Sequence, residues 1–147
     1  IEEGAMVGFY TESSPVSFVF SVEALKERMS WGLTGDASDV FFLDLKSFAE
    51  KMRKNQVEDK NTWISDRYVG EMREISVDGR KGYLFLLTKA FTWGMNSEGY
   101  ENGGYAFLDD KTRTYIFVEN KQGEKYIISY ITGNVISEKM LESFKFK

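Results

Sequence analysis

The 147-residue chain contains no cysteine and no histidine, and Pro15 is its only proline. Without thiols or imidazoles it has no cysteine–histidine zinc site, no cysteine nucleophile and no catalytic triad with a histidine base. No run of about 18 apolar residues occurs, so the sequence predicts no membrane-spanning helix. We therefore expect a protein that is not an enzyme and that carries no cofactor or metal ion.

Basic residues are outnumbered by acidic ones, 19 to 23, which gives a formal net charge of −4. Nucleic-acid binding depends on clustered lysine and arginine facing phosphates, so we expect no nucleic-acid partner. One basic cluster exists, at Lys46, Lys51, Arg53 and Lys54, but acidic residues interleave with it or flank it. This pattern indicates the solvated face of a helix.

Hydrophobic residues make up 42% of the chain and aromatic residues 16%, a composition that favours a folded globular domain. The length predicts a single domain over residues 1–147, with 1–15 as an edge or flexible segment. The absence of cysteine is compatible with several compartments. We expect an extracytoplasmic protein (periplasmic, secreted or lipid-anchored) if a leader was removed ahead of Ile1, and a cytoplasmic one if Met6 is the native start.

The first half of the chain mixes strand and helix patterns. Residues 16–20 are rich in β-branched and aromatic side chains and predict a strand, after which Ser21 could cap a helix over 22–31. The short apolar run at 40–43 predicts a buried strand. Asp44 then precedes the clearest helix, at 45–56, whose apolar residues recur at helical spacing at Leu45, Phe48, Ala49 and Met52.

From Trp63 onward the pattern is that of strands joined by tight turns. Strands are predicted at 63–69, 71–77, 82–88, 105–108, 114–119 and 125–132. Asp78-Gly79 is a hairpin signal between two of them. A helix is expected at 137–144. The sequence thus predicts an α+β fold: an antiparallel sheet, a meander in the C-terminal half, flanked by two or three helices.

A loop at 91–105 is the best local candidate for a binding site. It contains aromatic side chains among glycine, asparagine and glutamate, and such rings on a surface loop provide contact area at low entropic cost. The alternative interpretation is that the rings fold back on the edge of the sheet and that the glycines only permit turns. The candidate binding residues are Phe91, Trp93, Tyr100, Glu101 and Tyr105.

Three segments of the C-terminal half, Val77–Leu87, Lys125–Gly133 and Ser137–Phe146, resemble the Mog1/PsbP-like superfamily. The resemblance includes a Gly-Arg-Lys-Gly-Tyr strand start, a Tyr-Ile-Ile-Ser-Tyr strand and a short helix that closes in Ser-Phe-Lys-Phe. It implies an antiparallel sheet flanked by helices that acts as a non-catalytic adaptor. Relatives of this kind include lumenal photosystem accessory proteins, a nuclear-transport cofactor, bacterial envelope lipoproteins and secretion-effector chaperones.

These observations lead to two hypotheses about function. The first is an accessory or adaptor domain that binds another protein, as an exported lipoprotein-type domain or a secretion-system chaperone or immunity protein would. The second is a module that binds a carbohydrate or small ligand through the loop at 91–105.

Overall fold

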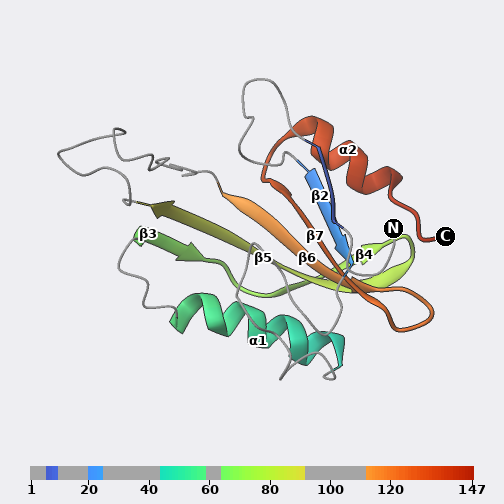
Figure 1. Cartoon of the computed structure of the whole chain (residues 1–147), viewed down its shortest axis with the longest axis horizontal. Coiled ribbons are helices and arrows are strands. Elements are labelled where there is room, and N and C mark those ends of the chain that lie inside the picture. Colours follow the sequence, from blue (N-terminus) through green and yellow to red (C-terminus); the bar gives the residue numbers. More distant parts are fainter. Residues whose placement is uncertain (1–5, 10–19, 25–43, 59–63, 92–111) are drawn as a thin grey trace.

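The structure, a computed structural model, describes residues 6–9, 20–24, 44–58, 64–91 and 112–147 (Figure 1). The elements within these ranges are β1 (Met6–Phe9), β2 (Phe20–Ala24), α1 (Leu45–Glu58), β3 (Ile64–Val69), β4 (Arg73–Val77), β5 (Arg80–Phe91), β6 (Arg113–Glu119), β7 (Lys125–Ile131) and α2 (Val135–Ser143).

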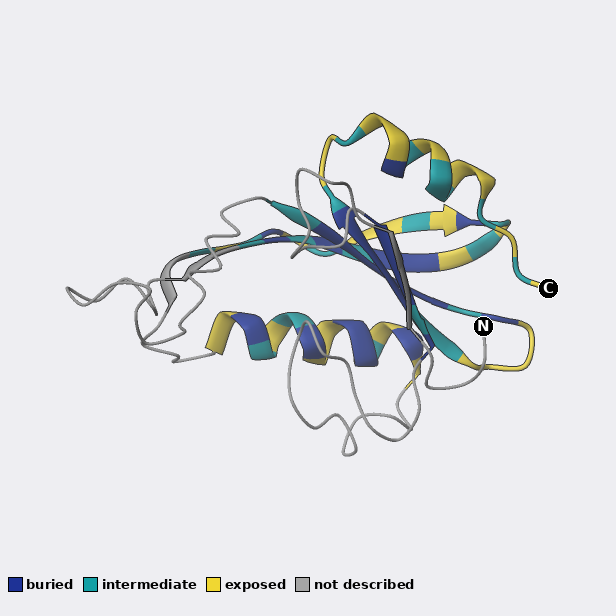
Figure 2. Ribbon diagram, turned by 45° about the horizontal axis from the view of Figure 1, so that its top comes forward, coloured by how far each residue is buried: buried dark blue, intermediate teal, exposed yellow. Residues whose placement is uncertain are grey.

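The described strands form one antiparallel sheet between two helices. Its order is β1-β2-β7-β6-β5, and β3 and β4 both pair with the side of β5 that faces away from β6. Helix α1 covers one face and α2 the other, so the molecule has three layers (Figures 1 and 2). The α+β prediction, with its antiparallel meander and flanking helices, is confirmed.

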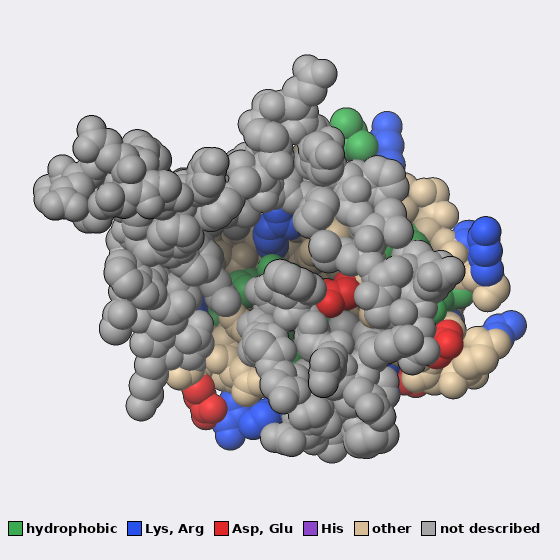
Figure 3. All heavy atoms as spheres, viewed as in Figure 1, with side chains coloured by type: hydrophobic (Ala, Val, Ile, Leu, Met, Phe, Trp, Pro, Cys, Tyr) green, Lys and Arg blue, Asp and Glu red, His purple; other side chains and the backbone are tan. Residues whose placement is uncertain are grey.

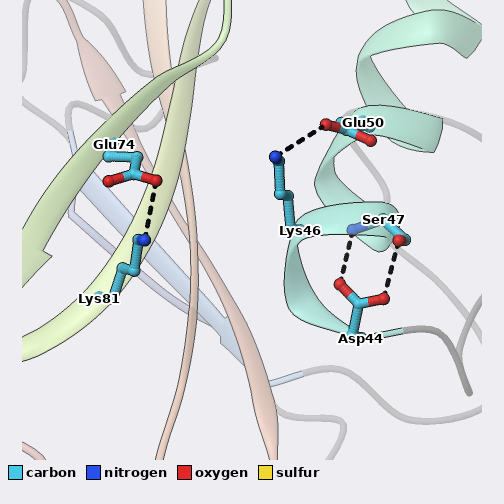
Figure 4. Close-up of polar contacts among 6 residues, drawn as sticks. All are labelled: Asp44, Lys46, Ser47, Glu50, Glu74 and Lys81. Carbon is cyan, nitrogen blue, oxygen red and sulfur yellow. Dashed lines mark hydrogen bonds and ion pairs between the residues drawn. The ribbon is translucent and has the colours of Figure 1, made fainter.

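Helix α1 starts and packs as its sequence pattern predicts. The Asp44 side chain caps it, because its Oδ1 accepts from the Ser47 amide at 3.0 Å and its Oδ2 from the Ser47 hydroxyl at 2.8 Å (Figure 4). These hydrogen bonds lower the pKa of Asp44. The residues buried against the sheet are Leu45, Phe48, Ala49, Met52 and Gln56, and the helix runs to Glu58, slightly beyond the predicted end.

The basic residues of α1 lie among acidic partners. Lys46 Nζ is 3.8 Å from Glu50 Oε1 one turn later (Figure 4), and Lys54 pairs with Glu58 in the same way at 3.6 Å. On the face shown in Figure 3, described side chains of both charge signs are interspersed. The predicted solvated helix face is present at Lys46, Lys51 and Lys54, and exposed pairs of this kind add little stability. Arg53 does not belong to it, because its side chain is half-buried and donates to the Gly70 carbonyl at 2.6 Å.

Strand β6 is buried on both faces because both helices cover the sheet. Tyr115 and Phe117 belong to the cluster on the α1 side, whereas Ile116 and Val118 belong to the cluster on the α2 side. The Phe117 ring stacks on Phe85 of β5 with ring centroids 5.7 Å apart. An uninterrupted apolar run is the pattern expected of a strand covered on both sides.

The hairpin at Asp78-Gly79 and the closing helix are also confirmed. Both turn residues have positive φ angles, 50° and 73°, which suit the tight turn between β4 and β5. Helix α2 occupies Val135–Ser143, close to the predicted 137–144, and Asn134 caps it by accepting from the Ser137 amide at 3.0 Å.

One prediction in the first half of the chain is wrong. Ser21 does not cap a helix over 22–31, because residues 20–24 form β2, which pairs with β7. Its buried apolar residues alternate along the strand, at Phe20, Val22 and Ala24. The Ser21 hydroxyl instead lies 2.7 Å from the hydroxyl of Ser129 across the strand pair. The rest of that predicted helix, and the predicted strands at 40–43 and 105–108, lie outside the described residues.

Candidate functional site

The structure describes only one of the five predicted binding residues. Phe91 is the last residue of β5 and pairs with Ile64 of β3, so β5 continues past the predicted end at residue 88, and residue 91 belongs to a strand and not to a loop. The strand is longer because β3 supplies backbone partners as far as that position. Trp93, Tyr100, Glu101 and Tyr105 lie outside the described residues.

A row of hydroxyl-bearing side chains crosses the sheet where β5 ends and β6 begins. Tyr68 of β3 lies opposite Thr88 of β5, and the Thr88 hydroxyl is 2.7 Å from that of Thr112. The amide of Thr132 donates to the Thr112 carbonyl at 2.9 Å. These four residues, Tyr68, Thr88, Thr112 and Thr132, are called the hydroxyl row below.

The hydroxyl row lies on the same face of the sheet as α2. Side chains of a strand alternate between its faces, so Thr88 shares the face of Leu84, four residues earlier. Leu84 packs in the cluster that contains Met140 and Leu141 of α2. The Thr132 hydroxyl is 2.9 Å from that of Thr114, which places it on this face as well.

Towards the centre of the sheet, the residues next to the hydroxyl row become progressively less polar. The next position inward carries Thr114 and Tyr130, which lie opposite each other on β6 and β7. The Tyr130 hydroxyl donates to Glu138 Oε2 of α2 at 3.3 Å. Burial and then the Glu138 charge raise the pKa of Tyr130, so its hydroxyl stays protonated and remains a donor at neutral pH.

Large side chains are exposed within the hydroxyl row and at its β7 end. Tyr68 is 58% exposed, and Val135 and Ile136 in the first turn of α2 are 67% and 64% exposed. Val135 follows Thr132 by one short turn, so the β7 end of the row leads directly into these aliphatic residues. The hydroxyl row together with Val135 and Ile136 is called the α2-side surface.

The chemistry of the α2-side surface is suited to binding. A threonine hydroxyl can donate one hydrogen bond and accept two, so the pairing of Thr88 with Thr112 leaves further capacity on both. Thr132 is exposed and the other two threonines are half-buried. An exposed tyrosine ring next to such hydroxyls offers apolar contact area and hydrogen bonds together.

Sequence patterns alone did not find the α2-side surface. Tyr68, Thr88 and Thr132 fall inside or at the ends of predicted strands, but a strand pattern does not say which strands will be neighbours. The available signal was the recurrence of threonine at strand ends in the second half, at Thr88, Thr112, Thr114 and Thr132. Their alignment depends on the register of β5, β6 and β7.

A second polar cluster joins the β4–β5 turn to the residues that follow α2. Asp78 Oδ1 accepts from Lys145 Nζ at 2.9 Å, and its Oδ2 accepts from the Phe146 amide at 3.0 Å. The hydrogen bond from Lys145, followed by that from Phe146, lowers the pKa of Asp78. The turn and the closing segment at 144–147 are therefore tied by one carboxylate.

This tie predicts a pH dependence of stability. The folded-state pKa of Asp78 lies below the unfolded value of about 3.9, so its ionisation stabilises the fold above about pH 4. The contribution is lost as the pH falls through the folded-state pKa. We expect the difference in urea midpoint between the wild type and Asp78→Asn to be present near neutral pH and to shrink at lower pH. A difference that persists unchanged to about pH 2 would contradict this assignment.

Among the residues that the structure describes, no group of three or more acidic side chains is arranged to hold a metal ion. Neither α1 nor α2 has the length and apolar character that a membrane crossing requires. No family model, curated protein or solved structure matches the chain. The function is therefore inferred from the chain's own residues and their geometry.

Proposed function

We propose that the protein is a non-catalytic accessory domain that binds another protein through the α2-side surface. The observation that carries the proposal is the exposure of Tyr68, Val135 and Ile136 on one side of the sheet, beside a row of hydroxyls. Tyrosine is enriched at protein interfaces, where its ring is buried by the partner and its hydroxyl forms a hydrogen bond. The hydrogen-bonded pairing of β3, β5, β6 and β7 holds the residues of the row in register for such contacts.

The chain connects this surface to the predicted recognition loop. Thr88 lies three residues before the end of β5, and Thr112 immediately precedes β6. The segment between these strands, 92–111, contains Trp93, Tyr100, Glu101 and Tyr105. We infer that these residues and the hydroxyl row contribute to the same partner contact.

The resemblance to Mog1/PsbP-like proteins supports an adaptor role, because protein binding is what those relatives have in common. An exported or lipid-anchored domain and a secretion-system chaperone or immunity protein are the two forms of adaptor that we propose.

The direct test compares two equally exposed side chains on opposite sides of the sheet. Tyr68→Ala should weaken binding of the physiological partner by about tenfold or more, because truncating an interface tyrosine commonly has an effect of that size. Val57→Ala is the control, since Val57 is 54% exposed at the end of α1 on the other side. A partner recovered with the wild-type protein would be purified and its Kd measured for all three forms by titration calorimetry. Equal Kd values for the wild type and Tyr68→Ala would contradict the proposed surface.

The second candidate is a module that binds a carbohydrate or small ligand. The exposed Tyr68 ring next to threonine hydroxyls favours it, because sugars are bound by aromatic stacking together with hydrogen bonds. Saturable quenching of tryptophan fluorescence by a sugar, lost in both Trp93→Ala and Tyr68→Ala, would favour this function over protein binding.

A further inference from the structure

The two helices differ in how firmly they pack on the sheet. Helix α1 buries Phe48, Ala49 and Met52, each with 1% exposure or less, whereas in α2 the only buried residue is Ser137. Figure 2 shows this difference as a dark-blue stripe along α1 and a mostly exposed α2. Met140 and Leu141 of α2 are only half-buried. Segments with few buried apolar contacts are the ones that open at low free energy.

Contacts beyond its last turn hold α2 in place. The centroid of the Phe146 ring lies 5.5 Å from that of the Tyr126 ring of β7 and 5.1 Å from that of the Phe144 ring. The Asp78 carboxylate binds Lys145 and the Phe146 amide, as described above. Both sets of contacts attach the closing segment at 144–147 to the far end of the sheet. They add to the contacts of α2 itself, which are the Glu138–Tyr130 hydrogen bond and the packing of Met140 and Leu141.

The connection before α2 is short and contains one glycine. Thr132 and Gly133 join β7 to the Asn134 cap, and Gly133 has a φ angle of 80°. A rotation at this point would move α2 and the closing segment together without disturbing the pairing of β6 and β7. It would leave an apolar sheet surface uncovered, since Ile116, Val118 and Ile128 are all 0% exposed in the α2-side cluster.

We propose that α2 and the closing segment form a latch, which opens as a unit while the sheet and α1 stay folded. The hydrogen bonds from Lys145 and Phe146 to Asp78 keep it closed, and Asp78 is called the catch below. Opening moves Val135 and Ile136 away together with α2 and exposes apolar residues of the sheet next to the hydroxyl row, so the latch controls which part of this face a partner can contact. This last role rests on the proposed function, whereas the opening itself is a property of the free protein.

The absence of cysteine allows the opening to be measured with single thiols. Val118→Cys places a thiol in the sheet cluster against which α2 and the closing segment pack, and Ala49→Cys places one on the buried face of α1; both positions are 0% exposed. A thiol reagent should label the Val118→Cys protein at least about tenfold faster than the Ala49→Cys protein, because a local opening needs less free energy than unfolding of the core. Equal labelling rates would overturn the proposal.

The catch is tested by adding Asp78→Asn to each single-thiol protein. Asparagine tolerates the positive φ of residue 78 but carries no charge. Labelling of the Val118→Cys protein should accelerate severalfold, because asparagine loses the ion pair with Lys145 and keeps only one side-chain oxygen as an acceptor, and labelling of the Ala49→Cys protein should change much less. Glu74→Gln is the matched control, because its carboxylate pairs with Lys81 at 2.8 Å in the same hairpin (Figure 4), whereas Asp78 is the carboxylate that binds the closing segment. The same acceleration with Glu74→Gln would overturn the role of Asp78.

Hydrogen exchange gives a second readout that needs no buried cysteine. Amides of α2 should exchange before those of β5, β6 and β7, and Asp78→Asn should increase exchange in α2 alone. If the amides of α2 exchanged only at the rate at which those of the whole sheet exchange, the latch proposal would be wrong. Neither experiment involves a partner, so the latch and the proposed function can fail separately. If the latch opened as expected but Tyr68→Ala bound the partner normally, the latch would be supported and the proposed surface would be wrong.

Discussion

Replacing Phe48 with alanine is expected to lower the free energy of unfolding by about 3–5 kcal/mol. Phe48 is 1% exposed and lies on the buried face of α1. Its ring meets Phe117 edge-on, with centroids 5.8 Å apart and planes inclined by 67°. The substitution removes this contact and leaves a cavity between helix and sheet. A domain of this kind has a total stability of about 5–15 kcal/mol, so the loss is a large fraction of it.

Val57→Ala is the control for this prediction, because Val57 lies on the same helix and is 54% exposed. Its effect should stay within about 0.5 kcal/mol. Urea denaturation followed by circular dichroism measures both variants. If the two midpoints shifted by the same small amount, α1 would not pack on the sheet as described.

The elements that the sequence predicted well are those specified by neighbouring residues. Helix α1 combines a capping aspartate with apolar residues at helical spacing, and both features act within one segment. The Asp78-Gly79 turn is similarly local, because both of its residues adopt positive φ angles. Strands β6 and β7 were found because each is a short run of β-branched and aromatic residues between turn signals.

The failed prediction shows where local patterns stop being informative. In residues 20–24 a spacing that fits a helix overlaps an alternation that fits a strand. The strand forms because Phe20 to Ala24 pair with Tyr130 to Tyr126 of β7, more than 100 residues later. Phe20 also stacks on the Tyr130 ring, with centroids 6.1 Å apart. The spacing of residues within a short segment carries no information about a pairing strand so distant in the sequence.

The candidate site could be predicted less well than the fold for the same reason. Aromatic and glycine composition pointed to 91–105, which is information carried within one segment. The hydroxyl row instead combines residues of β3, β5 and the segments next to β6 and β7, and the register of those strands aligns them. The catch likewise joins Asp78 to Lys145, 67 residues apart in sequence. Such sites exist only once the sheet has formed.

Gly82→Ala is expected to destabilise the fold by about 1–3 kcal/mol through overpacking. Gly82 lies in β5, and a Cβ atom there would be 2.8 Å from the Phe117 carbonyl oxygen. That oxygen belongs to the backbone of β6, which is paired with β5 on one side and β7 on the other, so it has little freedom to move. Strand β5 therefore has to shift or lose its pairing with β6 near its start.

Gly70→Ala provides the comparison, because the contact there is less severe. Its Cβ would lie 3.3 Å from the Leu86 Cβ, a distance that small adjustments can relieve. Gly70 is buried, but its neighbour has to move by only a few tenths of an ångström, so we expect a loss below about 1 kcal/mol for this variant. The urea midpoints of both proteins test this difference in stability. If Gly70→Ala lowered the urea midpoint more than Gly82→Ala, the close approach of β5 to β6 would not explain the glycine at position 82.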